Sequence, residues 1–293
     1  MDKILVTGKN GQLGRAIQSI IINSSESSNF VFVGRDELDL SDQNMITNYF
    51  KDKSFDTIIN CAAYTEVDKA EEEQSLANQI NHLAVSQLAQ ITKKLRANLI
   101  HVSTDYVFDG ENNEPYTESS KTNPINVYGK TKLAGEKVVK KILPTDAIII
   151  RTSWVYSEFG KNFVKSILRL GKDRNEINVV FDQVGTPTYA KDLADMILSI
   201  LKLLKLKKNK KTQIYHYSNK GKTSWYEFAK EILKEAKLEC KVNPVLSNYY
   251  SNLAKRPKNS LMSKSKIIKE FNLNIADFRT SLKSCISILN KRK

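Results

Sequence analysis

Cysteine is scarce in this chain, with 3 residues among 293. Cys61, Cys240 and Cys285 are far apart and odd in number, which argues against a disulfide framework and fits a reducing cytoplasm. The 3 histidines form no spaced cluster with cysteines or carboxylates. We therefore predict a cytoplasmic protein without a metal site.

Long hydrophobic runs, internal repeats and low-complexity tracts are also missing. The most apolar stretch, 196–206, is interrupted by Lys202 and Lys205, which indicates an amphipathic helix and not a membrane span. An apolar strand begins at residue 3, so cleavage of a leader would remove the loop that follows it. We expect neither a leader nor a membrane partner.

The net charge is +14, and it is unevenly distributed. Residues 200–293 hold 23 Lys+Arg and 6 Asp+Glu. This excess predicts either attraction of an anionic ligand or simply solvated, lysine-rich helices. The basic run 205–211 has no interleaved aromatic residues, so we expect no nucleic-acid partner.

Short apolar runs alternate with helical patterns through the first two thirds of the chain, which is typical of a doubly wound parallel sheet of the Rossmann type, an α/β fold. We expect a dinucleotide-binding domain formed by residues 1–155 and 176–217. A second, smaller mixed α/β substrate domain is expected from 156–175 and 218–293, with the ligand between the two. The predicted strands are 3–7, 30–34, 57–60, 98–103, 147–151, 177–181 and 213–217, and the predicted helices are 11–22, 41–51, 74–95, 126–142 and 189–206.

The first predicted strand runs directly into Gly8, and the spacing Gly-x-x-Gly-x-x-Gly continues through Gly11 and Gly14 into a helical pattern. Glycines at such a turn let the backbone approach a pyrophosphate, and the helix N-terminus supplies free N–H groups. The pattern predicts dinucleotide binding.

Tyr128 and Lys132 are four residues apart on a predicted helix, and so share one face. An ammonium one turn away would lower the pKa of the phenol and adapt it to acid–base chemistry. Thr104 ends a predicted strand, where ligands of doubly wound sheets bind. We interpret the three as a catalytic set; a solvated helix face and a plain turn are the alternatives.

The glycine loop, Thr104, Tyr128 and Lys132 occur in the order found in extended short-chain dehydrogenases/reductases, which the whole chain resembles. Within that superfamily it resembles the dTDP-4-dehydrorhamnose reductase family. The stretches that carry the resemblance are Cys-Ala-Ala-Tyr-Thr-Glu-Val-Asp at 61–68, Ser-Thr-Asp-Tyr-Val-Phe-Asp-Gly at 103–110, Tyr-Gly-Lys-Thr-Lys-Leu-Ala-Gly-Glu at 128–136, Arg-Thr-Ser-Trp-Val-Tyr at 151–156, Asp-Gln-Val-Gly-Thr-Pro-Thr at 182–188 and Arg-Pro-Lys-Asn-Ser at 256–260.

The resemblance implies reduction of the C4 keto group of dTDP-4-dehydro-6-deoxy-L-mannose to give dTDP-L-rhamnose for surface polysaccharide. Tyr128 would deliver the proton, Lys132 would bind the nicotinamide ribose, and Thr104 would hold the carbonyl oxygen. Related dehydratases have an Asp-Glu pair after the threonine, whereas Asp105 is followed by Tyr106 here. That difference favours simple reduction.

The resemblance also implies which residues contact the cofactor. Arg35 follows the second predicted strand and would pair with a 2′-phosphate, which favours NADPH, with NADH as the alternative. The expected cofactor residues are Gly8, Asn10, Gly11, Gln12, Leu13, Gly14, Arg35, Asp39, Leu40, Ala62, Ala63, Tyr64, Thr65, Tyr128 and Lys132.

On the substrate side, the resemblance points to a nucleotide sugar held by Thr104, Asp105, Trp154, Asn162, Gln183 and Arg256. Arg256 suits a diphosphate through paired hydrogen bonds, and an ordinary salt bridge is its alternative. Two other functions stay open: a reductase or epimerase of another nucleotide-linked 4-keto sugar, and a non-catalytic NADP-binding regulatory subunit. The oligomeric state is open, and a homodimer is one alternative.

Overall fold

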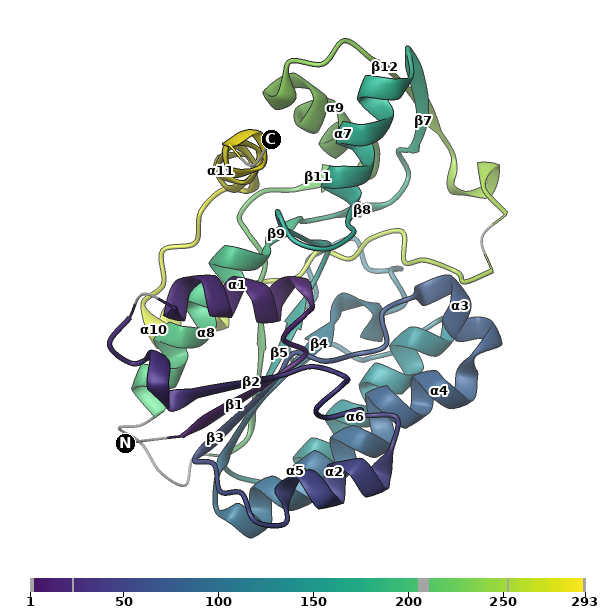
Figure 1. The fold of residues 1–293 in the computed structure, drawn as a ribbon. Coiled ribbons are helices and arrows are strands. Elements are labelled where there is room, and N and C mark those ends of the chain that lie inside the picture. Colours follow the sequence, from purple (N-terminus) through teal and green to yellow (C-terminus); the bar gives the residue numbers. More distant parts are fainter. Residues whose placement is uncertain (1–2, 23, 205–210, 252, 292–293) are drawn as a thin grey trace.

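The computed structural model describes residues 3–22, 24–204, 211–251 and 253–291. Its centre is a parallel sheet of six strands in the order β10-β5-β4-β3-β1-β2 (Figure 1). Every predicted strand of this sheet is present, and the fold class is confirmed. The six strands are β1 (Ile4–Thr7), β2 (Phe30–Val33), β3 (Thr57–Asn60), β4 (Asn98–Thr104), β5 (Ala147–Thr152) and β10 (Gln213–His216).

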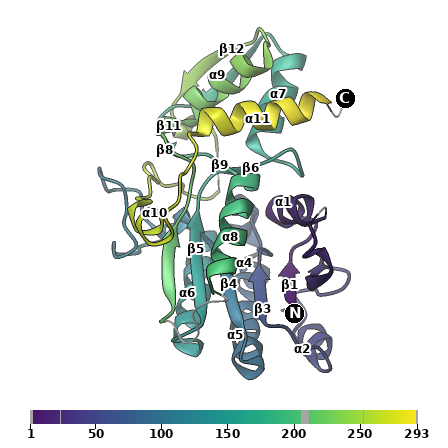
Figure 2. The same cartoon turned by 90° about the vertical axis from the view of Figure 1, so that its left-hand side faces the viewer.

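The strands form where short apolar runs can be buried on both faces of the sheet. All residues of β1, β3 and β5 are buried. Helices cover both faces and complete two apolar cores (Figures 1 and 2). One face packs against α1 (Gln12–Ile21), α8 (Ala190–Leu204) and α10 (Ser265–Phe271), and the other against α2 (Gln43–Phe50), α5 (Ala84–Leu95) and α6 (Val127–Ile142).

The chain enters the sheet at β1, continues to β2 on one side, and then returns to β3 on the other side of β1. The carboxyl ends of β1 and β3 therefore open a crevice, the usual ligand position in such sheets. The segment before α5 is an irregular helical run of α3 (Val67–Glu72), α4 (Gln74–Asn78) and one π-turn, Gln79–Leu83.

A smaller layer lies beyond the carboxyl ends of the sheet (Figures 1 and 2). It has its own apolar core, to which Val164, Phe228 and Phe278 contribute as fully buried side chains. Its elements are α7 (Phe163–Asp173), β7 (Glu176–Val180), β8 (Val184–Gly185), β11 (Thr223–Ser224), α9 (Trp225–Ala236), β12 (Lys241–Val245) and α11 (Phe278–Lys291), with the short pair β6 (Val155–Tyr156) and β9 (Thr188–Tyr189) at its base.

One predicted strand lies in a different place from that expected. β7 pairs in parallel with β12, outside the six-stranded sheet, so the assignment of this strand to the dinucleotide-binding part is wrong. β12 lies within 218–293, where no strand range was predicted. The division of the chain into two domains stays a prediction.

Candidate active site

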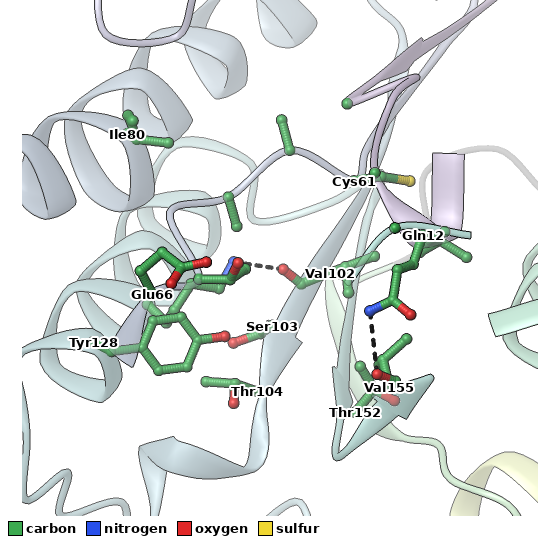
Figure 3. A pocket seen from close by; sticks show the side chains of 18 of the residues that line it. Gln12, Cys61, Glu66, Ile80, Val102, Ser103, Thr104, Tyr128, Thr152 and Val155 are labelled. Atoms are coloured by element: carbon green, nitrogen blue, oxygen red, sulfur yellow. Dashed lines mark hydrogen bonds between the residues drawn. The ribbon is translucent and has the colours of Figure 1, made fainter. Parts of the chain in front are cut away.

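One cavity of about 800 Å³ opens at the carboxyl ends of the central strands, and residues of both layers line it. Figure 3 shows Tyr128, Ser103 and Thr104 at one end of it, and Gln12 with Val155 across from them. The predicted site residues on its wall are Gly8, Asn10, Gly11, Gln12, Leu13, Arg35, Asp39, Leu40, Ala62, Ala63, Thr65, Thr104, Asp105, Tyr128, Lys132, Trp154 and Asn162. Gly14, Tyr64, Gln183 and Arg256 are not among the lining residues.

The glycine loop has the geometry that close approach to a pyrophosphate needs. Gly8 has φ +71°, a conformation that other residues adopt only with strain. A Cβ on Gly14 would lie 2.2 Å from the carbonyl oxygen of Gly8, so the turn could not close with a side chain there. Gly11 begins α1 without a side-chain cap. The first N–H groups of α1 therefore remain available to an anion, and the loop fits a dinucleotide.

The Gln12 side chain forms hydrogen bonds within the protein that link the glycine loop to the smaller layer. Its Nε2 donates to the carbonyl oxygen of Val155 at 3.2 Å, while its Oε1 accepts from Ser157 Oγ and Asn162 Nδ2, both at 3.0 Å. Asn162 in turn caps α7, because its Oδ1 accepts from the backbone N–H of Lys165. The Asn162 side chain therefore has a structural role: it binds Gln12 and caps α7.

At the adenine end, Arg35 projects from the loop after β2, and its side chain is 76% exposed. Its Nε lies 4.0 Å from Asp39 Oδ2, a long contact that leaves the guanidinium accessible. Glu37, the neighbouring acid, forms an ion pair with Lys9 and accepts from the backbone N–H of Gly34 at 2.9 Å. These contacts lower the pKa of the Glu37 carboxyl and occupy both of its oxygens.

The loop after β3 lines the cavity with its backbone and small side chains. Tyr64 turns away from it: its hydroxyl donates to Glu73 Oε2 at 2.6 Å and its backbone N–H donates to Asn81 Oδ1 at 2.9 Å. Tyr64 therefore anchors this loop to α4 and the π-turn, while Ala62, Ala63 and Thr65 remain on the wall.

Thr104, Tyr128 and Lys132 converge from two elements. Thr104 is the last residue of β4, and the other two lie one turn apart near the start of α6, which Asn126 caps by accepting from the Gly129 N–H. Lys132 is only 2% exposed, and its Nζ donates to the carbonyl oxygen of Val102 at 2.6 Å. An ammonium has three donors, so two remain for other partners.

The pKa of Tyr128 is raised in this structure, whereas the spacing predicted that Lys132 would lower it. The pKa of the Tyr128 phenol is raised to about 12, chiefly by burial; a hydrogen bond with Thr104 opposes the shift, and the charge of Asp105 adds to it. Burial also lowers the pKa of Lys132 to about 8, against the attraction of Glu136 and Cys61. Desolvation dominates because Lys132 is buried and Tyr128 is half-buried at the wall of the cavity, where the charged form of neither group is well solvated. Tyr128 is therefore a protonated phenol at neutral pH.

Asp105 is a buried carboxyl on the wall of the cavity, 2% exposed. Its Oδ1 accepts from Thr104 Oγ1 at 3.0 Å, whereas its Oδ2 has no hydrogen-bond partner in the part of the chain that the structure describes. Burial raises the pKa of this carboxyl to about 6. An unpaired buried oxygen is costly and is usually satisfied by a ligand or water.

Two of the predicted substrate residues, Arg256 and Gln183, are not among the residues that line the cavity. Arg256 Nη2 donates to Asp68 Oδ2 at 2.5 Å and its Nη1 donates to the carbonyl oxygen of Ala254 at 3.2 Å. The salt-bridge alternative considered from the sequence therefore describes this arginine, which ties the segment before it to α3. Gln183 is buried and likewise lies off the cavity wall.

The cavity also has lining residues that were not among the predicted site residues. Tyr106 packs edge-on against Tyr128 with ring centroids 5.6 Å apart, and a Cβ on Gly129 would lie 2.2 Å from the Tyr106 carbonyl oxygen, so α6 sits directly on the Tyr106 backbone. Many of the lining residues that were missed lie in the stretches that carry the family resemblance, and only that resemblance could have pointed to them. The missed lining residues include Cys61, Glu66, Val67, Ser103, Tyr106, Lys161 and Trp225.

Two absences hold for the described ranges alone. Between residues 3 and 291, leaving out the gaps given above, no three His, Cys, Asp or Glu side chains gather so that they could hold a metal ion. Within the same ranges, no helix is long and apolar enough to cross a membrane.

A parallel sheet with a glycine loop at its switch point, and a Thr, Tyr and Lys set beside it, is the arrangement expected from the resemblance to extended short-chain dehydrogenases/reductases. Comparison with known proteins makes the assignment narrower, since the family described as "RmlD substrate binding domain" matches residues 1–291. This chain belongs to that family.

Relatives with a named activity are similar to this chain along nearly their whole length. A dTDP-4-dehydrorhamnose reductase of Aggregatibacter actinomycetemcomitans is 37% identical over 290 residues, which cover 97% of this chain and 98% of the relative. The crystal structure of a dTDP-4-dehydrorhamnose reductase from Clostridium acetobutylicum has a TM-score of 0.91 at 39% identity, covering 98% of this chain and 99% of that one. A Bacillus anthracis dTDP-4-dehydrorhamnose reductase in complex with NADP has a TM-score of 0.91 at 36% identity, with the same coverage.

Proposed function

We propose that this chain reduces the C4 keto group of dTDP-4-dehydro-6-deoxy-L-mannose (dTDP-4-dehydrorhamnose) to give dTDP-L-rhamnose, a precursor of surface polysaccharide. The observation that carries the proposal is that one cavity holds Thr104, Tyr128 and Lys132 together with the glycine loop. The activity for which the similar proteins are named supports the same reaction.

The cofactor that we propose is NADPH, with NADH as the alternative. Glu37 is occupied by Lys9 and by the Gly34 N–H, so it is a poor acceptor for a ribose 2′-hydroxyl, while the exposed Arg35 guanidinium suits a 2′-phosphate. The Bacillus anthracis relative, which was solved with NADP, agrees with this choice.

When bound, NADPH would supply a hydride for C4 of the sugar and leave as NADP⁺. Tyr128 donates its phenolic proton to the C4 oxygen, so that ketone, hydride and proton give an alcohol. The raised pKa of Tyr128 suits this direction, because the phenol is protonated at neutral pH before the reaction. Thr104 orients the carbonyl oxygen with its hydroxyl. Lys132, whose Nζ keeps two donors beyond its bond to Val102, binds ribose hydroxyls.

Tyr106 supports reduction over elimination of water. The position after Asp105 lines the cavity with a phenol ring and not with a second carboxylate. Asp105, whose Oδ2 is unpaired in the described chain, is then a candidate acceptor for a sugar hydroxyl. A cytoplasmic location and a homodimer also stay predictions.

The test is turnover of dTDP-4-dehydrorhamnose with NADPH, measured by the fall in NADPH absorbance and by isolation of dTDP-L-rhamnose. Tyr128→Phe removes only the proposed donor, and we expect turnover to fall roughly 10²–10⁴-fold with unchanged NADPH binding. Tyr49→Phe is the matched control, because it removes a hydroxyl from α2, away from the cavity wall.

The outcomes separate the competing functions. Near wild-type turnover by Tyr128→Phe would remove this residue from the mechanism. Turnover only of another nucleotide-linked 4-keto sugar would point to a reductase or epimerase of that sugar. NADPH binding without turnover of any such sugar would favour the regulatory-subunit alternative.

A further inference from the structure

The two tryptophans of this chain are Trp154 and Trp225, and they stack on each other. Their ring centroids are 3.6 Å apart with an angle of 11° between the planes. They come from different layers: Trp154 lies between β5 and β6, and Trp225 is the first residue of α9. Both side chains line the cavity that holds Thr104 and Tyr128.

The fold holds this pair in place from several sides. Trp154 has φ +49°, a strained backbone conformation for a large side chain. A Cβ on Gly185 would lie 2.7 Å from the Trp154 ring, so β8 leaves space for the indole only because it has glycine there. Ser224 caps α9 by accepting from the backbone N–H of Glu227 at 3.1 Å, which fixes the turn that presents Trp225. Phe163 also contacts Trp225, with ring centroids 4.5 Å apart and an angle of 53° between the planes.

The two tryptophans form part of the cavity wall and are not only part of the apolar core. Both tryptophans are partly exposed, whereas Phe228 beneath them is fully buried. A strained residue kept in a cavity by surrounding structure is typical of a functional position. Indole rings bury large areas and bind the apolar faces of ring-shaped ligands, and they lose few rotamers in doing so.

We propose that Trp225 is a further substrate-binding residue, which forms with Trp154 one aromatic wall for the sugar of the nucleotide sugar. Trp225 contributes to the wall from α9 of the smaller layer, across the cavity from the central sheet. The inference rests on the proposed function, because it assigns the wall to that substrate. It also means that ligand binding changes the environment of both tryptophans.

The stack gives a direct readout that does not depend on turnover. Two stacked indoles couple in circular dichroism, and no other tryptophan contributes to the signal. We expect dTDP-L-rhamnose to change this coupled signal in the wild-type protein, and NADP⁺ alone to leave it nearly unchanged. Trp225→Phe and Trp154→Phe each abolish the couplet and identify it.

Kinetics then test whether Trp225 binds substrate. We expect Trp225→Ala to raise the KM for dTDP-4-dehydrorhamnose about tenfold, which corresponds to the energy of one good aromatic contact, with little change in kcat or in the Kd for NADPH. Trp225→Phe keeps an aromatic ring and should recover part of this loss. Tyr226→Leu is the matched control: it removes the next aromatic residue of α9, which is not on the wall, and should leave the KM unchanged.

The outcomes distinguish this inference from the proposed function. If wild-type protein turns over the substrate and Trp225→Ala leaves the KM unchanged, the inference is overturned and the function stands. An equal loss of NADPH binding in Trp225→Ala would mean general damage and would also overturn it. If wild type binds dTDP-L-rhamnose through Trp225 but does not turn over the keto sugar, the function fails and the wall stands. If wild type neither binds dTDP-L-rhamnose nor turns over the keto sugar, both the inference and the proposed function are overturned.

Discussion

Replacing Glu136 by Gln should destabilise the fold strongly, because it leaves a buried arginine without its counter-charge. Glu136 accepts from Arg151 Nε at 2.9 Å and from Nη2 at 2.6 Å, and its Oε1 also accepts from Ser103 Oγ at 2.6 Å. The two charged side chains are 2% and 3% exposed. Removing one partner of such a pair costs about 3–5 kcal/mol, a large part of a total stability of about 5–15 kcal/mol.

The assay is urea unfolding at neutral pH, followed by circular dichroism, for wild type, Glu136→Gln and the double variant Glu136→Leu/Arg151→Met. We expect the double variant to recover most of the loss, since replacing both charges of a buried pair by apolar groups is often nearly neutral. Asp195→Asn is the control, because its partner Lys191 and Asp195 are 46% and 47% exposed and such pairs contribute about 0–1 kcal/mol. A loss of less than about 1 kcal/mol for Glu136→Gln, no larger than for Asp195→Asn, would refute the reasoning.

Three further predictions concern the cavity. The pKa of Asp105 in the folded protein is raised to about 6, so ionisation of this carboxyl lowers the stability of wild type as the pH rises from about 4 to 6. The free energy of unfolding of Asp105→Asn, relative to that of wild type, should therefore rise by up to about 3 kcal/mol between pH 3.5 and pH 8. Urea unfolding at both pH values measures this, and a pH-independent difference would contradict it. Arg35→Ala should weaken NADPH binding by about 1.5–3 kcal/mol and NADH binding little, by fluorescence titration; equal weakening would make Arg35 structural. Gly14→Ala places a Cβ against the Gly8 carbonyl oxygen, so we expect loss of cofactor binding in the same titration, and normal affinity would show that the loop can move.

The sequence by itself determined the elements that depend on local pattern. Short apolar runs such as Ile148–Ile150 form strands because only a sheet buried on both faces accommodates them, and β5 is buried along its whole length. The glycine spacing at Gly8, Gly11 and Gly14 demanded a tight turn before a helix, and α1 begins there. The four-residue interval between Tyr128 and Lys132 placed both on one face of α6.

Only the tertiary structure decided which partners these elements meet. β7 has the pattern of a buried strand, but it pairs with β12, about sixty residues later in the chain, and no local pattern encodes that choice. The sequence does not show which carboxylate, if any, pairs with Arg256; the fold brings Asp68 to it. Burial raises the pKa of Tyr128, whereas the spacing alone predicted that Lys132 would lower it. Trp154 and Trp225 stack although 71 positions separate them, because side-chain packing between layers depends on distances in space and not on intervals along the chain.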